Sequence, residues 1–401
     1  MDPKQILAQR ILLPELALKK FYFSKDHYQI HVVTQAWGSR PDGGVCTGCA
    51  TLSLNVYDHR VIRVKDEPLR GKPVWLRIKK RRFHCQNCKK IFSEPIQGIM
   101  PRRRTTQRYR RAVLEACEQH QSIRAVRKLF KCSSSLIYTT LYEQLELRRR
   151  MRQHSWPEVI GIDEISFRRN KQFRCMEYAS VIVDVNARRV MELVQGKKAS
   201  DLVNALAEIP GRENVKWVVM DMCDPFRKFV RLFFPNAKIV ADKFHVLRLI
   251  TPSLLTTLKN ETEVGVERRK IRSLMLSRPQ NLSFAERSRL HRFLNPYARL
   301  LGMYNAKEKL FRLYEMRNAT FAPESYEKFL GDLQVSNVYE LQRLRNTLHK
   351  WRHEVLNYFQ CRITNGITEG FNNKIKLVKR MAYGYRSFRN FRLRVLNACA
   401  G

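Results

Sequence analysis

The pattern of apolar and polar positions divides the chain into four regions that predict different secondary structure. Residues 1–100 show short strand patterns separated by PDGG and GKP turns. Residues 101–150 change to apolar positions at helical spacing, opened by the basic cluster RRRTTQRYRR. A mixed region with two helical patterns follows, and residues 243 to about 360 are helical and basic. The mixed region predicts an α/β domain, with strands at residues 156–167, 173–185, 188–196, 215–222 and 237–242.

The chain from residue 367 onward opens with a helical pattern and ends in a basic segment rich in aromatic residues. Its aromatic residues alternate with arginines, which suits stacking on exposed bases, and packing in a core is an equal alternative. These aromatic residues are Tyr383, Tyr385, Phe388 and Phe391.

The charge of the chain indicates its partner. Hydrophobic residues make up 44% of the 401 residues, but 76 Lys and Arg against 36 Asp and Glu give a formal net charge of +40. Such an excess attracts polyanions, so double-stranded DNA is the expected partner. A membrane-surface protein is the competitor, but no segment concentrates basic residues on one face. The chain lacks an apolar run of the roughly 18 residues that a membrane span needs and a secretory pattern, so we expect a cytoplasmic, nucleoid-associated protein without a membrane partner.

Four of the ten cysteines form two CxxC pairs, Cys46 with Cys49 and Cys85 with Cys88. Two such pairs within 43 residues are typical of a closed, structural zinc site with four thiolate ligands. Strand patterns in the 35-residue gap between the pairs indicate a β-meander, as in a zinc ribbon. The alternatives are unrelated buried cysteines, a redox CxxC, or His84 as a substitute ligand. The other six cysteines are expected to be buried thiols in a reducing compartment.

Residues 108–147 contain three helical patterns, with a short turn at residues 131–133 between the last two. Ser122 can cap the second helix, and the serine run at 133–135 can cap the third. This arrangement predicts a helix-turn-helix that places its last helix in the major groove, and a plain three-helix bundle is the alternative. The residues expected to contact DNA are Arg102, Arg103, Arg104, Ser134, Ser135 and Tyr138.

Three acidic residues lie where a strand or helix pattern meets charge. Asp163 and Asp221 end strand patterns, and Glu369 lies in the first turn of a helix that begins near Thr368. A buried carboxylate is unfavourable unless it is paired or bound to metal. Mg²⁺ prefers carboxylate oxygens, and two such ions about 3.5–4 Å apart catalyse in-line phosphoryl displacement.

Other carboxylates compete with these three. Asp242 ends the fifth strand pattern beside His245, and either residue is a possible member of the site. Asp224 is expected to cap the next helix, and Glu164 to point away from Asp163 on the opposite face of its strand. Asp184 is also near a strand end, and we expect it to be a solvated or capping carboxylate.

Four separated blocks, GIDEIS, VVMDMCDPF, FPNAKIVADKFHV and TNGITEGFNNKIKLVKRMAYGYRSFRNFR, resemble the signature blocks of bacterial insertion-sequence transposases of the DDE type. More narrowly, the chain resembles the family with an N-terminal zinc ribbon and a helix-turn-helix. The resemblance implies a ribonuclease H-like fold with a mixed five-stranded sheet. In that fold the first Asp lies on the first strand, the second just after the fourth, and the Glu on a late helix. The strand count agrees with Asp163, Asp221 and Glu369.

The spacing of the three acidic residues, 58 (221 − 163) and 148 (369 − 221), implies a helical insertion before Glu369. We therefore expect a multidomain α/β protein. The helix after Glu369 carries basic residues suited to phosphate contacts, namely Lys374, Lys376, Lys379 and Arg380. The expected domains are a zinc ribbon (1–100), a helix-turn-helix (101–150), a ribonuclease H-like domain (156–242 and 361–395) and a basic helical insertion (243–360).

These features predict a transposase that binds the terminal inverted repeats of an insertion sequence, cuts DNA and joins the freed 3′-hydroxyl to target DNA. The expected cofactors are two Mg²⁺ or Mn²⁺ ions per active site and structural Zn²⁺. Because two DNA ends must be paired, a homodimer or larger complex is expected. The alternatives are a non-catalytic DNA-binding regulator and a branched-DNA nuclease of the same fold.

Overall fold

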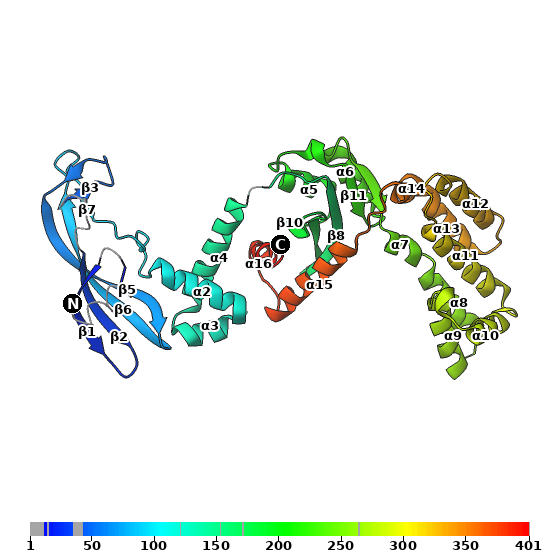
Figure 1. Ribbon diagram of the computed structural model, residues 1–401, viewed down its shortest axis with the longest axis horizontal. Coiled ribbons are helices and arrows are strands. Elements are labelled where there is room, and N and C mark those ends of the chain that lie inside the picture. The colour runs from blue at the N-terminus through cyan, green and yellow to red at the C-terminus, as the bar shows by residue number, and fades with distance from the viewer. Residues whose placement is uncertain are drawn as a thin grey trace. The chain divides into compact units, whose positions relative to one another are not determined.

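The computed structural model describes residues 12–13, 16–34, 43–120, 122–152, 154–170, 172–263 and 265–400. The chain forms two compact units, residues 1–150 and 151–401, each with its own core (Figure 1). Within the described ranges, no helix is both long and apolar enough to cross a membrane. The end of the first strand pattern and the start of the PDGG turn, residues 35–42, lie outside the described part of the chain.

The first unit is built on a five-stranded sheet in the order β1-β2-β6-β5, with β7 paired to β6. Its longest strands, β5 and β6, form an antiparallel hairpin in the gap between the two CxxC pairs, and a separate two-stranded sheet, β3-β4, lies beside the first pair. The gap thus holds a long hairpin rather than the expected meander, and β1 was not predicted. The strands are β1 (Leu16–Phe23), β2 (Tyr28–Thr34), β3 (Gly44–Val45), β4 (Leu52–Ser53), β5 (Val56–Leu69), β6 (Lys72–His84) and β7 (Ile91–Ser93).

Three helices follow this sheet: α2 (Gln107–His120), α3 (Ile123–Phe130) and α4 (Ser134–Met151). As expected from the serine positions, the Ser122 hydroxyl accepts from the Ala125 N–H, and the Ser133 hydroxyl accepts from the Leu136 N–H. Lys131 adopts a left-handed conformation at the end of α3, so the helix ends there and the chain turns into α4 within three residues. The helix α2 packs against α3 and β5.

The second unit contains a mixed five-stranded sheet in the order β10-β9-β8-β11-β12. Its first three strands are antiparallel neighbours, whereas β8, β11 and β12 run parallel. Parallel neighbours need crossover connections, and the helices α5 (Ala199–Leu206) and α6 (Asp224–Phe233) supply them. The strands are β8 (Val159–Arg169), β9 (Met176–Asp184), β10 (Arg189–Gln195), β11 (Trp217–Met220) and β12 (Lys238–Ala241). All five follow the predicted patterns.

Both faces of this sheet are covered by helices. Successive residues of β9 alternate between two cores: Ile182 packs into the core of α5 and α6, and its neighbours Val181 and Val183 pack against α15 (Gly366–Met381) and α16 (Phe388–Ala398). The C-terminal segment is therefore not a tail. Phe391 is fully buried and stacks on Phe167 with ring centroids 5.3 Å apart, which confirms the core-packing alternative for this aromatic residue.

Between β12 and α15 the chain forms a helical region, in the basic stretch where helices were predicted. Its helices are α7 (Lys243–Arg248), α8 (Thr251–Glu261), α9 (Val266–Leu276), α10 (Phe284–Leu294), α11 (Ala298–Glu315), α12 (Ala322–Gln334), α13 (Tyr339–Lys350) and α14 (Arg352–Cys361). Buried residues of these helices join the same core as α5 and α6, so the region is packed onto the sheet rather than tethered to it.

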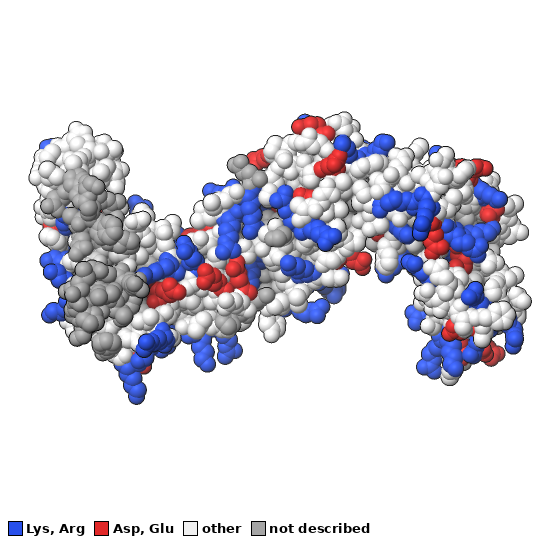
Figure 2. Space-filling model, in the orientation of Figure 1, with Lys and Arg blue, Asp and Glu red and all other residues white. Residues whose placement is uncertain are grey.

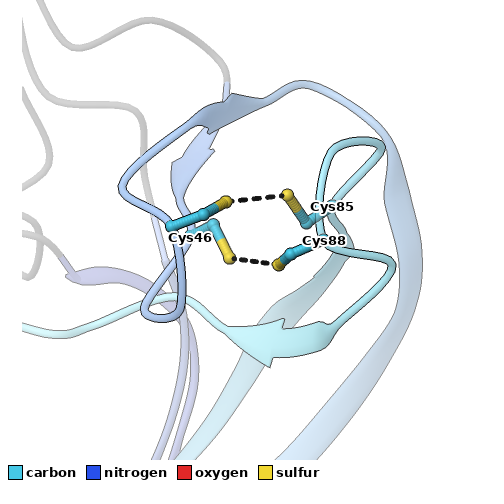
Figure 3. Close-up of side chains that lie close together, drawn as sticks. Cys46, Cys85 and Cys88 are labelled. Carbon is cyan, nitrogen blue, oxygen red and sulfur yellow. Dashed lines mark hydrogen bonds between the residues drawn. The ribbon is translucent and has the colours of Figure 1, made fainter.

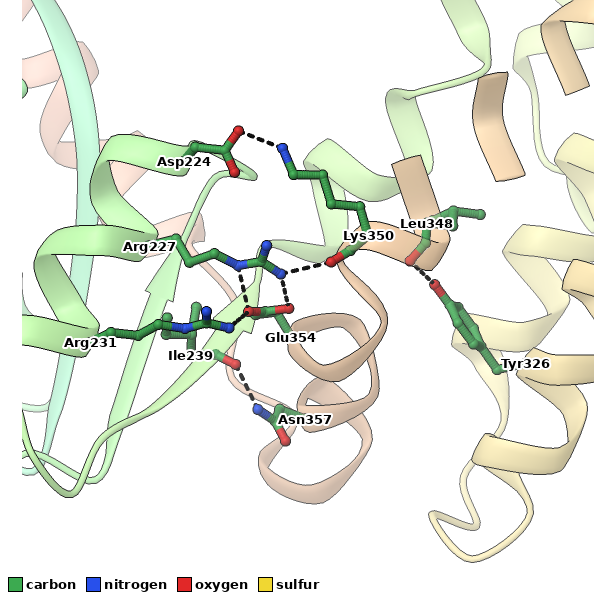
Figure 4. Close-up of polar contacts among 9 residues, drawn as sticks. All are labelled: Asp224, Arg227, Arg231, Ile239, Tyr326, Leu348, Lys350, Glu354 and Asn357. Carbon is green, nitrogen blue, oxygen red and sulfur yellow. Dashed lines mark hydrogen bonds and ion pairs between the residues drawn. The ribbon is translucent and has the colours of Figure 1, made fainter. Parts of the chain in front are cut away.

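A buried ion pair anchors this helical region to α6 (Figure 4). The Arg227 guanidinium donates to Glu354 through Nε at 2.7 Å and Nη2 at 2.5 Å, and it lies 3.9 Å from the Trp351 ring centroid. Asp224 was expected to cap α6, but the N-cap residue is Cys223, and Asp224 is the first residue of the helix. The Asp224 side chain pairs with exposed Lys350. The Glu354 side chain is only 3% exposed.

We predict that Glu354→Gln lowers the free energy of unfolding of the second unit by roughly 3 kcal/mol, because it leaves the buried Arg227 charge without its counterion. The matched control is Asp224→Asn, which breaks an exposed pair in the same contact and should change stability by less than about 1 kcal/mol. Urea unfolding of both variants measures the difference. Equal free energies of unfolding for the two variants would show that the burial of the Glu354 ion pair contributes nothing to stability.

Candidate active site and metal centres

The four cysteines of the CxxC pairs converge into one cluster (Figure 3). The Sγ atoms of Cys46 and Cys88 lie 3.5 Å apart, as do those of Cys49 and Cys85. A tetrahedral zinc site with Zn–S bonds of about 2.3 Å separates its sulfur atoms by about 3.8 Å, so the cluster fits that ion. The backbone N–H of Gly48 donates to Cys46 Sγ, and this hydrogen bond is the main cause that lowers the Cys46 pKa.

Among the described residues, the cluster consists of these four cysteines, and His84 is not part of it. A closed four-sulfur set leaves no open coordination position, so the role of this site is structural. Of the other six cysteines only Cys117 and Cys399 are fully buried and Cys175 is exposed, so the expectation of six buried thiols was wrong.

In the second unit, acidic side chains from four separate elements line a pocket of about 740 Å³. Asp163 lies in the middle of β8 rather than at the end of a strand, Asp221 directly follows β11, and Asp242 directly follows β12. Glu369 lies in the first turn of α15. The pocket thus brings together residues as far apart in the sequence as Asp163 and Glu369, which are separated by 206 positions (369 − 163). These residues come from the central strand, the carboxyl ends of β11 and β12, and a late helix.

Asp163 is held from two sides. Its Oδ1 accepts from the Glu164 backbone N–H at 2.7 Å, and its Oδ2 accepts from Asn372 Nδ2 at 2.7 Å. Burial and then the neighbouring Asp221 carboxylate raise the Asp163 pKa to about 6. The carboxylate is therefore fixed in position but unfavourable to ionise, the state expected of a group that a bound cation neutralises.

His245 lies between two of the carboxylates. Its Nδ1 is 2.8 Å from Asp221 Oδ1 and 2.9 Å from Asp242 Oδ2, and contacts to these two groups raise the His245 pKa to about 10. Asp242 is almost fully buried, caps α7, and accepts from the Asn365 backbone N–H at 3.0 Å. Both oxygens of Asp242 are thus occupied, whereas among the described residues the Asp221 side chain pairs with His245 alone.

The approach of α15 to β8 depends on Gly161. A Cβ at this position would lie 2.3 Å from Thr368 Oγ1 and 2.9 Å from Asn365 Oδ1, both at the start of α15. Thr368 precedes Glu369 and is fully buried. The absence of a side chain at residue 161 therefore allows the Glu369 helix turn to sit against the strand of Asp163.

We predict that Gly161→Ala lowers stability by roughly 1–3 kcal/mol through overpacking and lowers any DNA cleavage by about 100-fold, because it displaces Glu369. Adding Thr368→Ala removes the clashing hydroxyl and should recover part of both losses. Gly302→Ala, on α11 with open space around it, is the control and should leave both unchanged. Urea unfolding and a plasmid cleavage assay check this; full activity of Gly161→Ala would contradict the close approach.

Comparison with known proteins assigns this arrangement to a family. Residues 160–395, which contain all four carboxylates, match the family model of the ISL3 transposase DDE domain, described as "Transposase". The chain belongs to the ISL3 family of transposases. Residues 42–88 match the zinc-finger of transposases IS204, IS1001, IS1096 and IS1165, and they include all four clustered cysteines. The predicted resemblance is thereby confirmed, and the first unit of this transposase carries a zinc ribbon whose four clustered cysteines support structural zinc.

The chain is also similar, over most of its length, to one curated transposase. It is 25% identical over 372 residues to the transposase for insertion sequence element IS1001 of Bordetella parapertussis, covering 89% of each chain. A shorter match, 33% identical over 96 residues, is to a protein named ATP-dependent protease of Lactococcus lactis subsp. lactis and covers 23% of this chain and 26% of that one.

The basic residues predicted to bind DNA fall in different surroundings in the transposase. Lys376 lines the carboxylate pocket, and Lys374 and Arg380 are exposed on α15. Lys379 is half-buried and donates to the Ser166 carbonyl oxygen at 2.6 Å, a hydrogen bond that connects α15 to β8. Lysine and arginine are spread over both units on the face drawn in Figure 2.

The predicted contacts of the first unit lie on α4 and just before α2. Ser135 and Tyr138 are exposed on the first turns of α4, Ser134 is half-buried, and the Tyr138 ring stacks on Tyr142 with centroids 6.0 Å apart. The three arginines at 102–104 are exposed in the loop that leads to α2.

Several residues of the pocket escaped the sequence analysis. No pattern in the sequence singled out Asn372, although its side chain donates to Asp163. Glu164, expected to point away from Asp163, also lines the pocket, where it pairs with Lys197 at 3.2 Å. Arg278 reaches the pocket from the helical region, and no pattern in the sequence distinguishes it from other arginines there.

Proposed function

We propose that this transposase binds the terminal inverted repeats of an insertion sequence and catalyses two-metal DNA cleavage and strand transfer. Asp163, Asp221 and Glu369 are the proposed metal ligands. The observation that carries the proposal is their convergence, from three distant segments, on one pocket inside the transposase family match. A cluster of carboxylates in a chain of net charge +40 repels DNA locally unless a cation lies between them.

The fold of the second unit supports a ribonuclease H-like assignment. Its sheet has the mixed order 3-2-1-4-5 in chain numbering, with Asp163 on the first strand and Asp221 after the fourth. A late helix carries the third acidic residue, and a helical insertion interrupts the domain before it. These are the positions that the family resemblance implies for a DDE triad.

The donor set fits Mg²⁺ or Mn²⁺. The three proposed ligands offer only carboxylate oxygens, the donors that these hard cations prefer. The raised Asp163 pKa fits as well, because a nearby cation would offset the unfavourable charge. Bound there, two ions would supply Lewis-acid stabilisation of the phosphodiester and of the attacking oxygen.

Asp221 is preferred over Asp242 as the second ligand because of their hydrogen bonds. Asp242 accepts from Asn365 and from the backbone and ring of His245, so its oxygens already stabilise the starts of α7 and α15. Asp221 is less buried. We assign Asp242 a positioning role: it orients His245, which in turn contacts Asp221.

The remaining side chains of the pocket orient a metal ligand or bind the DNA strand. Asn372 fixes the Asp163 carboxylate through its Oδ2. Lys376, Arg248 and Arg278 line the same pocket and supply positive charge for the DNA strand that enters it. No serine or tyrosine nucleophile is required, because water or a DNA 3′-hydroxyl attacks the phosphodiester directly.

The first unit supplies DNA recognition in this proposal. The zinc ribbon and a helix-turn-helix formed by α3 and α4 would bind the element ends, with Ser134, Ser135 and Tyr138 of α4 near base edges and the arginines at 102–104 on phosphates. Pairing two ends requires at least two active sites, so the functional assembly is a homodimer or larger.

A plasmid carrying both element ends tests the function. In Mg²⁺ the full chain should cut at the ends, and a pre-cut end with a free 3′-hydroxyl should become joined to target DNA. Binding without nicking would identify a regulator instead. Cutting of branched DNA without any joined product would identify a nuclease of the same fold.

A further inference from the structure

A second pocket, of about 460 Å³, lies in the first unit where the sheet meets the three helices. Strands β5 and β6, the loop before α2, the helix α2 and the start of α4 each contribute to its wall. No acidic residue is among the described residues that line it. Its basic lining residues are Arg63, Lys65, Arg102, Arg103, Arg104 and Arg110.

Two buried side chains of this pocket have hydrogen-bond donors without a partner. Arg110 is only 1% exposed, and its Nε and Nη1 are unpaired; Thr105 is 5% exposed, and its Oγ1 is unpaired. A buried donor left unpaired destabilises the fold by about 1–3 kcal/mol, so such groups normally have a ligand or a function. Three unpaired atoms on the wall of one basic pocket point to an anion with several acceptor oxygens.

The acidic groups nearby do not satisfy this charge. Glu143 is shared between Arg103 and Arg110, so one carboxylate faces two guanidinium groups. Asp66 is buried and already accepts from Arg108 Nε at 2.7 Å and from the Thr106 hydroxyl at 2.7 Å. The Arg63 guanidinium lies 3.9 Å from the Trp75 ring centroid, which holds it at the wall. The pocket therefore keeps an excess of positive charge in fixed positions.

The pocket is also tied to the helices that follow it. Lys65 Nζ donates to the carbonyl oxygens of Phe130 and Lys131 at 2.8 Å each, at the end of α3. Leu136, on the first turn of α4, lines the pocket next to the predicted base-contacting residue Ser135. An anion bound here would consequently lie beside the start of α4.

We propose that this pocket binds one backbone phosphate of the DNA duplex contacted by α4, which fixes the register of that helix on the DNA. This inference rests on the proposed function of the first unit in DNA binding. A phosphodiester supplies the acceptor oxygens that Arg110 and Thr105 lack, and the exposed Arg63 and Arg104 would flank it. Backbone contacts of this kind position a protein without reading sequence, so a duplex of arbitrary sequence is a sufficient probe.

Fluorescence anisotropy of a short synthetic duplex, titrated with the full chain at several salt concentrations, tests this proposal. Arg63→Gln should weaken binding roughly tenfold at low salt and reduce the slope of log K against log salt by about 0.9, the value of one phosphate contact. The matched control Arg60→Gln removes the same charge from an exposed position on the same strand, outside the pocket. It should leave the slope unchanged.

Thr105→Val is the second variant, because it keeps every charge and the shape of the side chain. It should weaken duplex binding by roughly threefold, through loss of one hydrogen bond, without lowering the melting temperature. Equal affinities and slopes for Arg63→Gln and Arg60→Gln would overturn the proposal. A second result would also overturn it: inorganic phosphate stabilises the wild type, but neither pocket variant changes the affinity for the duplex. The pocket would then bind a free anion rather than a DNA phosphate. Failure of the wild type to bind any duplex would overturn the proposed function as well.

Discussion

Asp163→Asn should lower the rate of DNA cleavage and strand transfer by roughly a thousandfold, about 4 kcal/mol of transition-state stabilisation. Asparagine keeps the shape of the side chain, but its single oxygen can accept from Asn372 Nδ2 or from the Glu164 N–H and not from both. What it removes is the negative charge that the proposed metal site requires. Binding to element ends should be unchanged, because that function is assigned to the other unit. Single-turnover cleavage and a gel-shift assay measure the two quantities.

The same substitution should remove the loss of stability that the metal-free wild type shows as the pH rises from about 4 to about 6. Because the Asp163 pKa is raised to about 6 in the folded chain, ionisation at pH 7 favours unfolding, and asparagine removes that penalty. A smaller loss of stability over this pH range, together with lost activity, separates a catalytic role from misfolding. Glu158→Gln is the control, since this exposed residue lies just before β8 and pairs with Lys216 outside the pocket. Wild-type cleavage by Asp163→Asn would remove the triad from the account.

Cys85→Ser should abolish stoichiometric zinc binding and unfold the ribbon around the two CxxC pairs. Structural zinc contributes about 10–16 kcal/mol of apparent binding free energy at pH 7, and the Cys85 sulfur is fully buried within the cluster. Hydrogen exchange should show loss of protection at β3, β4, β7 and the end of β6, which flank the two CxxC pairs in the chain. The second unit has its own core and should unfold at its normal urea concentration.

Removal of a cysteine outside the cluster is the control for this effect. Cys175 is exposed in the second unit, and Cys175→Ser should keep the full zinc content. Zinc released per chain, measured with a chromogenic chelator, gives the comparison. A Cys85→Ser protein that retains one zinc per chain would contradict the four-thiolate site.

The sequence predicted those features of the fold and the site that depend on a residue type and on the pattern of its neighbours in the chain. Cys46 and Cys85 each belong to a short motif whose spacing alone favours one metal, and Asp221 follows an apolar strand whose end is visible in the sequence. The blocks around Asp163 and Glu369 resemble a family, so the two could be paired across 205 intervening residues.

Features that depend on tertiary contacts were not predictable in the same way. The placement of His245 between Asp221 and Asp242 requires the parallel pairing of β11 and β12, which no local pattern encodes. The need for glycine at residue 161 arises from a helix more than 200 residues later. Phe391 was equally compatible with DNA stacking and with a core, because exposure is decided by what α16 packs against.

The proposed function requires that Asp163, Asp221 and Glu369 together hold divalent metal ions. Crystals soaked in Mn²⁺ and measured at the manganese absorption edge test it directly. Anomalous peaks are expected between Asp163 and Asp221, with Glu369 as a further ligand. Saturating Mn²⁺ that leaves this pocket without an anomalous peak would contradict it.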